Sequence, residues 1–378
     1  MPSRRILKVG CPLLATLLAL AMIPVAFWSC GQDRPVRIGF AGSLSGRFSD
    51  LATEGLNGLQ LAVDEQNQVG GIQGRRVEVL VRDIGYDSSL AAEAFIQLVD
   101  EGVVAVVGPM TSAMAPAMIA EADQLRVPIL SPTVSSNALA GKDDWFLRVM
   151  SPSKAESVRL AGYAAKELNL RRLMAVVDVS NANYSLEYVD NFRAAFLETG
   201  GLEVLEQRFD TRTKPEFRTL ASTVVHARPE AVLLVTGALD GAMICQHLRL
   251  GGMNGHLLSS GWAMTADFVA QAGQSGEGTL FCHPFKPMTG AHHKFLDRFR
   301  QRFGHDPGFA GAMAYESGLT ILQAMKQTLE PKRIKDILLQ DREYAGVQGS
   351  FRFDRYGDAQ RAMFLIEVRD GILRGLEG

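Results

Sequence analysis

Short apolar runs rich in valine and isoleucine alternate with amphipathic segments along most of this chain, and that alternation sets its fold class. In the first part we predict strands at 36–41, 77–81, 103–107 and 128–130, separated by helices at 51–68, 88–100 and 112–125. Strands that are apolar at nearly every position are typical of a parallel sheet whose two faces are both covered by helices. The sequence therefore predicts a doubly wound α/β fold.

The alternation begins again after residue 151, which indicates a second unit of the same kind. Helices are predicted at 155–168, 184–198, 217–226 and 239–250, and strands at 173–177, 203–209, 231–235, 256–259 and 279–282. Helices at 291–302, 311–329 and 332–339, a hairpin around 351–358 and a last strand at 364–368 follow. Two doubly wound parallel-sheet units predict two lobes with a cleft between them, joined near Ser151-Pro152 and His283-Pro284.

Composition limits the classes of function. Charged residues make up 21 % of the 378 residues and hydrophobic residues 47 %, as in an ordinary globular protein. That length suits two domains of about 150 residues each. The formal net charge is −2, and only doublets of Lys and Arg occur after residue 30. We expect no nucleic-acid partner, because phosphate binding needs a basic face.

The first thirty residues have the pattern of a secretory signal peptide. Three basic residues open the chain, Arg4, Arg5 and Lys8. An apolar run at 11–28 follows and ends at Ser29-Cys30. We therefore predict a signal peptide at 1–29 and expect the remaining chain outside the cytoplasmic membrane.

The break at Cys30 resembles a bacterial lipobox, in which the cysteine receives diacylglycerol before cleavage. Phe27 and Trp28 stand where a lipobox usually has leucine and a small residue. The resemblance implies a protein anchored to a membrane by lipid, in the periplasm or on the outer cell surface. Plain secretion, or retention of 11–28 as an uncleaved anchor, are the alternatives.

Enzyme and metal motifs are missing from the sequence. Gly39, Gly42 and Gly46 do not have the spacing of a dinucleotide-binding GxGxxG, and GxxxxGK[ST], GxSxG and HExxH are absent. The adjacent pair His292-His293 would point about 100° apart on a helix, so we expect these side chains at the surface and no metal site. Cys245 and Cys282 lack metal-ligand spacing. We favour two buried free thiols over a disulfide between them.

Six segments occur in an order that matches a known family. They are 38–46 (IGFAGSLSG), 57–65 (NGLQLAVDE), 70–75 (GGIQGR), 107–112 (VGPMTS), 128–132 (PILSP) and 353–358 (FDRYGD). With these segments the chain resembles the leucine/isoleucine/valine-binding protein family of periplasmic solute-binding proteins, over nearly its whole length beyond the signal peptide.

The resemblance implies a type I two-lobed fold that closes on a ligand held between the lobes. The N-terminal lobe would comprise 33–152 plus 283–362 and the C-terminal lobe 153–282 plus 363–378, with three crossovers as the hinge. It also implies a binding protein without enzymatic activity or cofactor. Such a protein captures a small polar ligand, a branched-chain amino acid or related carboxylate, and delivers it to ABC permease subunits in the membrane. A sensor for a membrane receptor, or a binder of amides, urea or aromatic carboxylates, are the alternatives.

One wall of the ligand site is predicted after the strand that ends at Gly108-Pro109. The next helix is expected to start near Ser112, so its free N–H groups and positive dipole end would suit a carboxylate, and Thr111 or Ser112 would add a hydroxyl. The resemblance assigns the carboxylate contact to Ser112 and further contacts to Thr133 and Ser135. Capping of their own helices is the alternative role of Ser112 and Ser135.

The opposite wall is predicted around 178–184, which matches the loop where the family carries a ligand-facing tyrosine. Tyr184 would cover the ligand as the cleft closes and donate a hydrogen bond to it. Asn183 is a neighbouring polar candidate. An ordinary aromatic residue at the start of a helix is the alternative role of Tyr184.

The sequence departs from the family where an amino-acid ligand needs its ammonium group held. Members that bind amino acids use an acidic residue after the strand that corresponds to 257–259, but residues 259–262 here read Ser-Ser-Gly-Trp. Asp240 is a candidate for the missing negative charge, with helix capping as its alternative role. Trp262 is a candidate for a flat wall of the pocket, with plain packing as its alternative.

Overall fold

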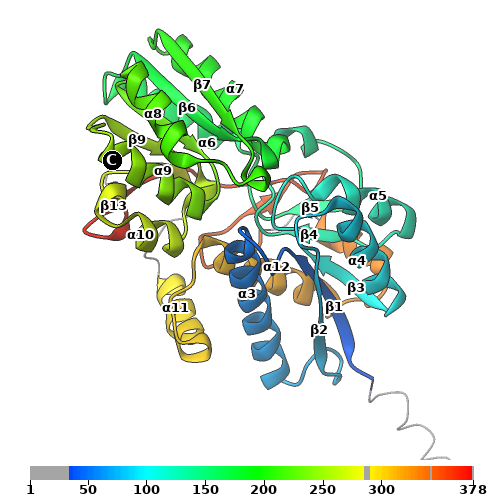
Figure 1. Ribbon diagram of the computed structural model, residues 1–378. Coiled ribbons are helices and arrows are strands. Elements are labelled where there is room, and N and C mark those ends of the chain that lie inside the picture. Colours follow the sequence, from blue (N-terminus) through cyan, green and yellow to red (C-terminus); the bar gives the residue numbers. More distant parts are fainter. Residues whose placement is uncertain (1–33, 285–289, 341–342, 377–378) are drawn as a thin grey trace, which may run out of the picture.

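The computed structural model describes residues 34–284, 290–340 and 343–376, so the predicted signal peptide and Cys30 lie outside the described residues. Two α/β lobes lie beside each other, one built on a five-stranded sheet and one on a seven-stranded sheet (Figure 1). We call them the five-stranded lobe and the seven-stranded lobe. None of the described helices combines the length and the apolar character that crossing a membrane requires.

The five-stranded lobe contains a parallel sheet in the order β2-β1-β3-β4-β5. Its strands are β1 (Val36–Gly42), β2 (Val77–Asp83), β3 (Val103–Val107), β4 (Ile129–Ser131) and β5 (Phe146–Arg148). Phe40 near the end of β1 lies opposite Val81 in β2 and Val107 in β3. The carboxyl ends of these strands therefore share one edge of the sheet, where ligand sites form in open α/β folds.

Helices cover both faces of this sheet, as the apolar strands predict. One layer holds α3 (Ser49–Gln68) and α12 (Phe309–Met325), and the other holds α4 (Ser88–Asp100) and α5 (Ala115–Leu125). The helix α11 (Gly290–Phe303) packs beside α3, and α13 (Pro331–Leu338) packs beside α12. The five-stranded lobe is therefore built from two parts of the sequence: its strands come from the first part, and three of its helices come from residues after 289.

The seven-stranded sheet has the order β14-β13-β10-β9-β8-β6-β7. Its strands are β6 (Arg172–Asp178), β7 (Glu203–Phe209), β8 (Ala231–Val235), β9 (His256–Ser259), β10 (Leu280–His283), β13 (Phe364–Arg369) and β14 (Ile372–Gly375). β13 pairs antiparallel with β10, and β14 pairs antiparallel with β13, so one edge departs from the predicted parallel arrangement. Asp370 and Gly371 join β13 to β14 with positive φ angles of 56° and 70°, as a two-residue hairpin requires.

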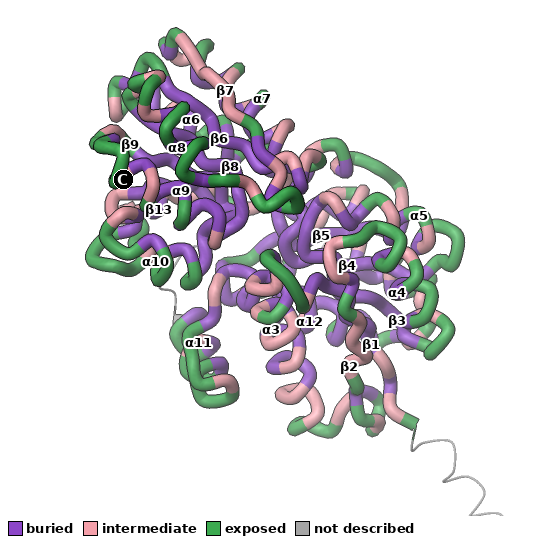
Figure 2. The backbone as a smooth tube through the Cα atoms, in the orientation of Figure 1, coloured by how far each residue is buried: buried purple, intermediate pink, exposed green. Residues whose placement is uncertain are grey.

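Two groups of helices accompany this sheet, and its central strands β6, β8, β9 and β10 are largely buried, whereas the edge strands β7 and β14 are not (Figure 2). α6 (Lys154–Lys166) packs on α7 (Ala182–Glu198), and α9 (Ala238–Leu250) packs on α8 (Phe217–Ala227) and α10 (Ala266–Ala272). Short 3-10 turns occur at η1 (Asn137–Leu139), η2 (Val179–Asn181), η3 (Thr211–Thr213), η4 (Gly261–Ala263) and η5 (Gly273–Gly276). A small hairpin pairs β11 (Arg352–Phe353) with β12 (Ala359–Gln360). The chain passes between the two sheets after β5, after β10 and after β12.

Candidate ligand-binding cavity

One wall of a cavity begins where β3 ends. Gly108 follows β3 with φ +124°, and a Cβ at this position would lie 2.1 Å from the carbonyl oxygen of Ala41. Glycine is the residue that allows this conformation and this approach to β1. Met110, Thr111 and Ser112 come next, and all three are buried in the lining of the cavity.

The following helix begins at Ala115, so the predicted start near Ser112 was wrong. Pro116 lies in the first turn of α5, where a missing N–H leaves no hydrogen bond unmade, and residues 112–114 form a turn before the helix. The N–H of Ala113 donates to Oδ1 of Asn181 in the other lobe at 2.9 Å. The hydroxyl of Ser112 accepts a bond from the backbone N–H of Ser136 at 3.3 Å, so its own proton is available to a ligand.

The loop between β4 and η1 forms the rest of this wall. Thr133 and Ser135 are buried there and line the same cavity. The hydroxyl of Thr133 donates to the carbonyl of Met110 at 2.6 Å, which ties the loop to the segment after β3. Because that proton is engaged, Thr133 presents lone pairs to the cavity, and Ser112 and Ser135 are left as hydroxyl donors.

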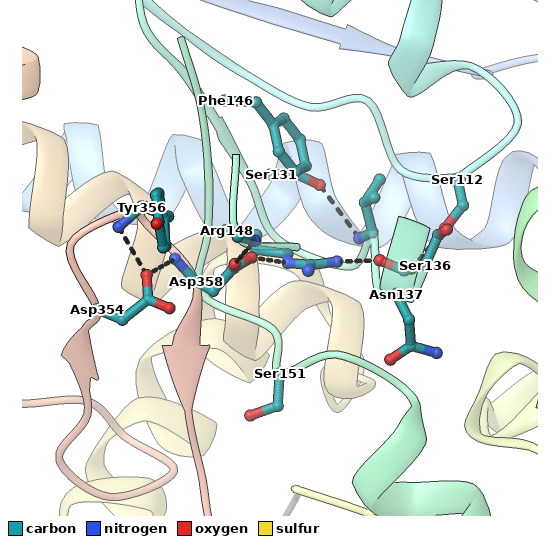
Figure 3. Close-up of polar contacts among 12 residues, drawn as sticks. Ser112, Ser131, Ser136, Asn137, Phe146, Arg148, Ser151, Asp354, Tyr356 and Asp358 are labelled. Carbon is teal, nitrogen blue, oxygen red and sulfur yellow. Dashed lines mark hydrogen bonds and ion pairs between the residues drawn. The ribbon is translucent and has the colours of Figure 1, made fainter. Parts of the chain in front are cut away.

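A buried ion pair between Arg148 and Asp358 stabilises this loop through a hydrogen bond to Ser136 (Figure 3). Arg148 of β5 is fully buried, and its Nε donates to Oδ1 of Asp358 at 2.6 Å. Its Nη1 donates to the carbonyl of Ser136 at 2.7 Å. Asp358 immediately precedes β12, so the hairpin at 352–360 supports the loop that carries Ser135.

The seven-stranded lobe contributes an aromatic wall. Tyr184 in the first turn of α7 and Trp262 in η4 are buried and meet edge to face, with ring centroids 6.1 Å apart. Trp262 also stacks at 5.5 Å on Phe48, which belongs to the five-stranded lobe. Asn181 in η2 lines the cavity close to Tyr184 in sequence. Aromatic contact across the lobes therefore closes this side of the cavity.

Two titratable groups in the lining were not identified from the sequence. Glu156, in the first turn of α6, is buried, and its Oε1 accepts the N–H of Gly261 at 2.6 Å. Burial raises the pKa of Glu156 to about 8. His283 at the end of β10 packs against Phe309 with ring centroids 4.5 Å apart. Burial, assisted by the charge of Arg361, lowers the pKa of His283 to about 3, so its ring is neutral at pH 7.

The cavity lies between the lobes, because its lining residues come from both of them. Its polar lining consists of Thr111, Ser112, Thr133, Ser135, Glu156, Asn181 and His283, and the remainder of Leu51, Met110, Met150, Tyr184, Gly261, Trp262 and Phe309. Among the described lining residues there is no lysine or arginine.

Further contacts join the lobes around the cavity. Glu187 of α7 accepts bonds from the hydroxyl of Ser136 at 3.0 Å and from the N–H groups of Asn137 at 2.7 Å and Ala138 at 3.0 Å. The hydroxyl of Tyr86 lies 3.4 Å from the carbonyl oxygen of Ser180. These contacts make the described arrangement a closed one.

The structure brings most of the predicted ligand residues to one place. Those that line the cavity are Thr111, Ser112, Thr133, Ser135, Tyr184 and Trp262. Asn183 is instead exposed, and Asn181, two residues earlier in η2, lines the cavity. Asp240 is buried outside the cavity, where it accepts from Thr211 and pairs with Arg47, and Gly237 holds the N-cap position of α9.

A sequence signal for Glu156 does exist. Glu156, Leu160 and Ala164 share the buried side of α6 at spacings of four residues. A carboxylate inside an apolar helical stripe is uncommon unless it has a partner or a function. The pattern of buried residues does not predict whether that side of the helix faces a sheet or a cavity. The buried side of α6 faces both.

Cys245 and Cys282 are free and buried, as favoured from the sequence. Burial raises the pKa of Cys245 to about 12, which makes its thiol unreactive.

The predicted surface position was wrong for His292. This residue is buried, with its Nδ1 2.7 Å from Nε2 of Gln348, whereas His293 is exposed. Packing of α11 places one side chain of the adjacent pair inward. Over the described ranges no three His, Cys, Asp or Glu side chains gather as metal ligands.

The sequence also matches known proteins. A family model described as periplasmic binding protein matches residues 35–372. Leu/Ile/Val-binding protein homolog 3 of Brucella melitensis is 23 % identical over 247 residues, which cover 65 % of this chain and 66 % of that protein, just under two thirds of its length.

Two solved structures share the fold. The branched-chain amino acid transporter substrate-binding protein LivJ of Streptococcus pneumoniae, in complex with isoleucine, has a TM-score of 0.83 at 24 % identity and covers 91 % of this chain and 99 % of LivJ. An ABC transporter solute-binding protein of Rhodopseudomonas palustris, in complex with 3,4-dihydroxybenzoic acid, has a TM-score of 0.81 at 17 % identity and covers 91 % and 96 %. The predicted two-lobed α/β fold is confirmed by these likenesses.

Proposed function

The chain belongs to the periplasmic binding protein family, and from that premise we propose that it captures a small polar solute between its lobes and delivers it to an ABC importer. The proposed solute is an amino acid of the branched-chain type or a related carboxylate. Members of this family are solute-binding proteins and not enzymes, in accord with the expectation from the sequence.

The lining of the cavity carries this proposal. Hydroxyl groups of Ser112 and Ser135 come from the five-stranded lobe, and the rings of Tyr184 and Trp262 come from the seven-stranded lobe. Hydroxyl donors suit a carboxylate, and the apolar part of the lining suits an aliphatic side chain. Only a closed arrangement contacts a solute from both sides, so binding would favour closure.

The relatives support a ligand that carries a carboxylate. The Brucella protein is named as a Leu/Ile/Val-binding homolog, and LivJ holds isoleucine. The Rhodopseudomonas protein holds an aromatic carboxylic acid. An aromatic carboxylate is therefore the second candidate, and the two share the group that Ser112 would bind.

We further propose how the chain is divided and located. The lobes would comprise 33–152 plus 283–362 and 153–282 plus 363–378, with the three crossings between the sheets as the hinge. Export by a signal peptide at 1–29 and lipid attachment at Cys30 would anchor the protein outside the cytoplasmic membrane, within reach of permease subunits. Presentation of the ligand to a membrane sensor is the alternative to transport.

Calorimetry with a panel of amino acids, amides, urea and aromatic acids tests the proposed ligand class, using wild-type protein and Ser112→Ala. This change removes one donor to a charged oxygen, which costs about 1.5–3 kcal/mol, or roughly 10- to 150-fold in affinity. Asn183→Ala is the matched control, because Asn183 is exposed and lies outside the cavity. This variant should bind the solute with the same affinity as the wild type. Binding of amides or urea without binding of any carboxylate would refute the proposal, and unchanged affinity in Ser112→Ala would remove Ser112 from the site.

A further inference from the structure

Glu156 is a buried carboxylate in the wall of a cavity that has no cationic side chain among its described lining residues. Its Oε1 accepts the N–H of Gly261 at 2.6 Å, and the uncharged hydroxyl of Tyr188 lies near the carboxylate. No ion pair to Glu156 is formed by the described lysines, arginines or histidines. Burying a carboxylate without a positive partner is costly, and proteins commonly supply such a partner or a proton.

We infer that Glu156 binds the ammonium group of the solute, so that the ligand is a zwitterionic α-amino acid and not a simple carboxylate. This inference rests on the proposed function and narrows it. The ligand's carboxylate would meet the Ser112 and Ser135 hydroxyls of one lobe, and its ammonium would meet Glu156 of the other. Its side chain would then contact the apolar lining, which includes Met150 and Phe309.

The neighbours of Glu156 leave the positive charge to the ligand. Tyr184 and Tyr188 of α7 and Cys282 of β10 lie near the carboxylate, and burial raises the pKa of each above its ordinary value. His283 of β10 is neutral at pH 7 because burial lowers its pKa. All of these side chains are therefore uncharged at neutral pH.

The two arginines whose charges act on Cys282 and His283, the neighbours of Glu156, are exposed to solvent or already paired. Arg159, on the same helix as Glu156, is exposed to solvent, and Arg361 pairs with the buried carboxylate of Glu316. The Gly261 N–H, from η4, orients one oxygen of Glu156. A carboxylate with an oriented oxygen and no charged neighbour in contact is a specific site for a ligand cation.

A pH dependence follows from the same geometry. Without ligand, burial raises the pKa of Glu156 to about 8, so the carboxyl group is largely protonated at pH 7. A bound ammonium stabilises the ionised form and lowers that pKa. Binding should therefore release a proton below about pH 8, and affinity should fall by up to about tenfold per pH unit as the pH falls from 8 toward the pKa of the complex.

The test compares leucine with 4-methylpentanoate, which is leucine without its ammonium group, on wild-type protein and Glu156→Gln. The glutamine keeps an acceptor for the Gly261 N–H and removes the charge. We expect wild-type protein to bind leucine about 30- to 1,000-fold more tightly than 4-methylpentanoate, as for other buried charge pairs, and the variant to lose this preference. Calorimetry in buffers of different ionisation enthalpy should detect proton release on leucine binding at pH 7 in the wild type and not in the variant.

Asp144→Asn is the matched control, because burial also raises the pKa of Asp144, to about 6, and this residue is outside the cavity lining. It should keep the preference for leucine. Equal wild-type affinity for the two ligands would overturn the role of Glu156 while leaving the proposed capture of a carboxylate intact. Failure of wild-type protein to bind leucine while it binds another carboxylate would also overturn the inference alone, and failure to bind any amino acid or carboxylate would overturn both. The wild-type comparison decides the inference even if Glu156→Gln does not fold.

Discussion

At the scale of single residues, Gly261 determines how closely three groups approach one another. A Cβ at this position would lie 2.4 Å from Cδ2 of His283 and 3.2 Å from Oε1 of Glu156. Gly261→Ala should therefore displace the His283 ring and the carboxylate, with a loss of about 1–3 kcal/mol in the free energy of unfolding and weaker leucine binding. Urea unfolding and calorimetry measure the two effects.

Gly162→Ala is the control for that prediction. A Cβ at Gly162 in α6 meets nothing within 4 Å. Alanine there should be neutral or stabilise the helix by up to about 1 kcal/mol. Equal unfolding free energies for the two variants would show that crowding at Gly261 is unimportant.

Sequence reasoning at this scale identified side chains that follow strand ends and overlooked one on a helix. Ser112, Thr133 and Ser135 follow β3 and β4, whose carboxyl ends share an edge of the sheet, so the family pattern and the topology point to the same place. Glu156 was missed because helical periodicity predicts that a face is buried without predicting what faces it. Asp240 has the negative charge that an ammonium group needs, but it lies outside the cavity. It binds Arg47 and Thr211, which are distant in sequence and could not be identified as its partners from the sequence.

At the scale of elements, the hairpin of β11 and β12 should be a structural support of the ligand site. Asp358→Ala leaves the Arg148 guanidinium buried without its carboxylate, which costs about 3–5 kcal/mol of unfolding free energy. Glu203→Ala is the control, because its pair with Arg172 is solvent-exposed and should contribute at most about 1 kcal/mol. Urea unfolding of both variants checks this, and similar losses in the two would contradict the supporting role.

Long apolar or amphipathic elements and the short buried strands β4, β9 and β10 were predicted within a few residues, whereas β5, β14 and α10 were not. β5 has three residues and is defined by its pairing with β4, which no local pattern reveals. β14 is a mostly exposed edge strand without an apolar run, and α10 spans seven residues. The start of α5 was misplaced because Pro116 was not weighed as a marker of the first helical turn.

At the scale of the whole molecule, restarted alternation of strands and helices was enough to predict two lobes. It was not enough to predict the antiparallel edge, because β13 returns from the other lobe without a helical crossover. The closed arrangement depends on contacts between residues distant in sequence, such as Glu187 with Asn137 and Phe48 with Trp262. These contacts are few and surround the cavity, so a bound solute should decide between open and closed forms.

Small-angle X-ray scattering of the protein with and without leucine tests most directly whether a solute is captured between moving lobes. Binding is verified on the same samples by calorimetry. The proposed mechanism predicts a smaller radius of gyration with leucine, because the empty protein opens and the bound solute holds the lobes together. Identical scattering profiles from empty and verified leucine-bound protein would contradict it.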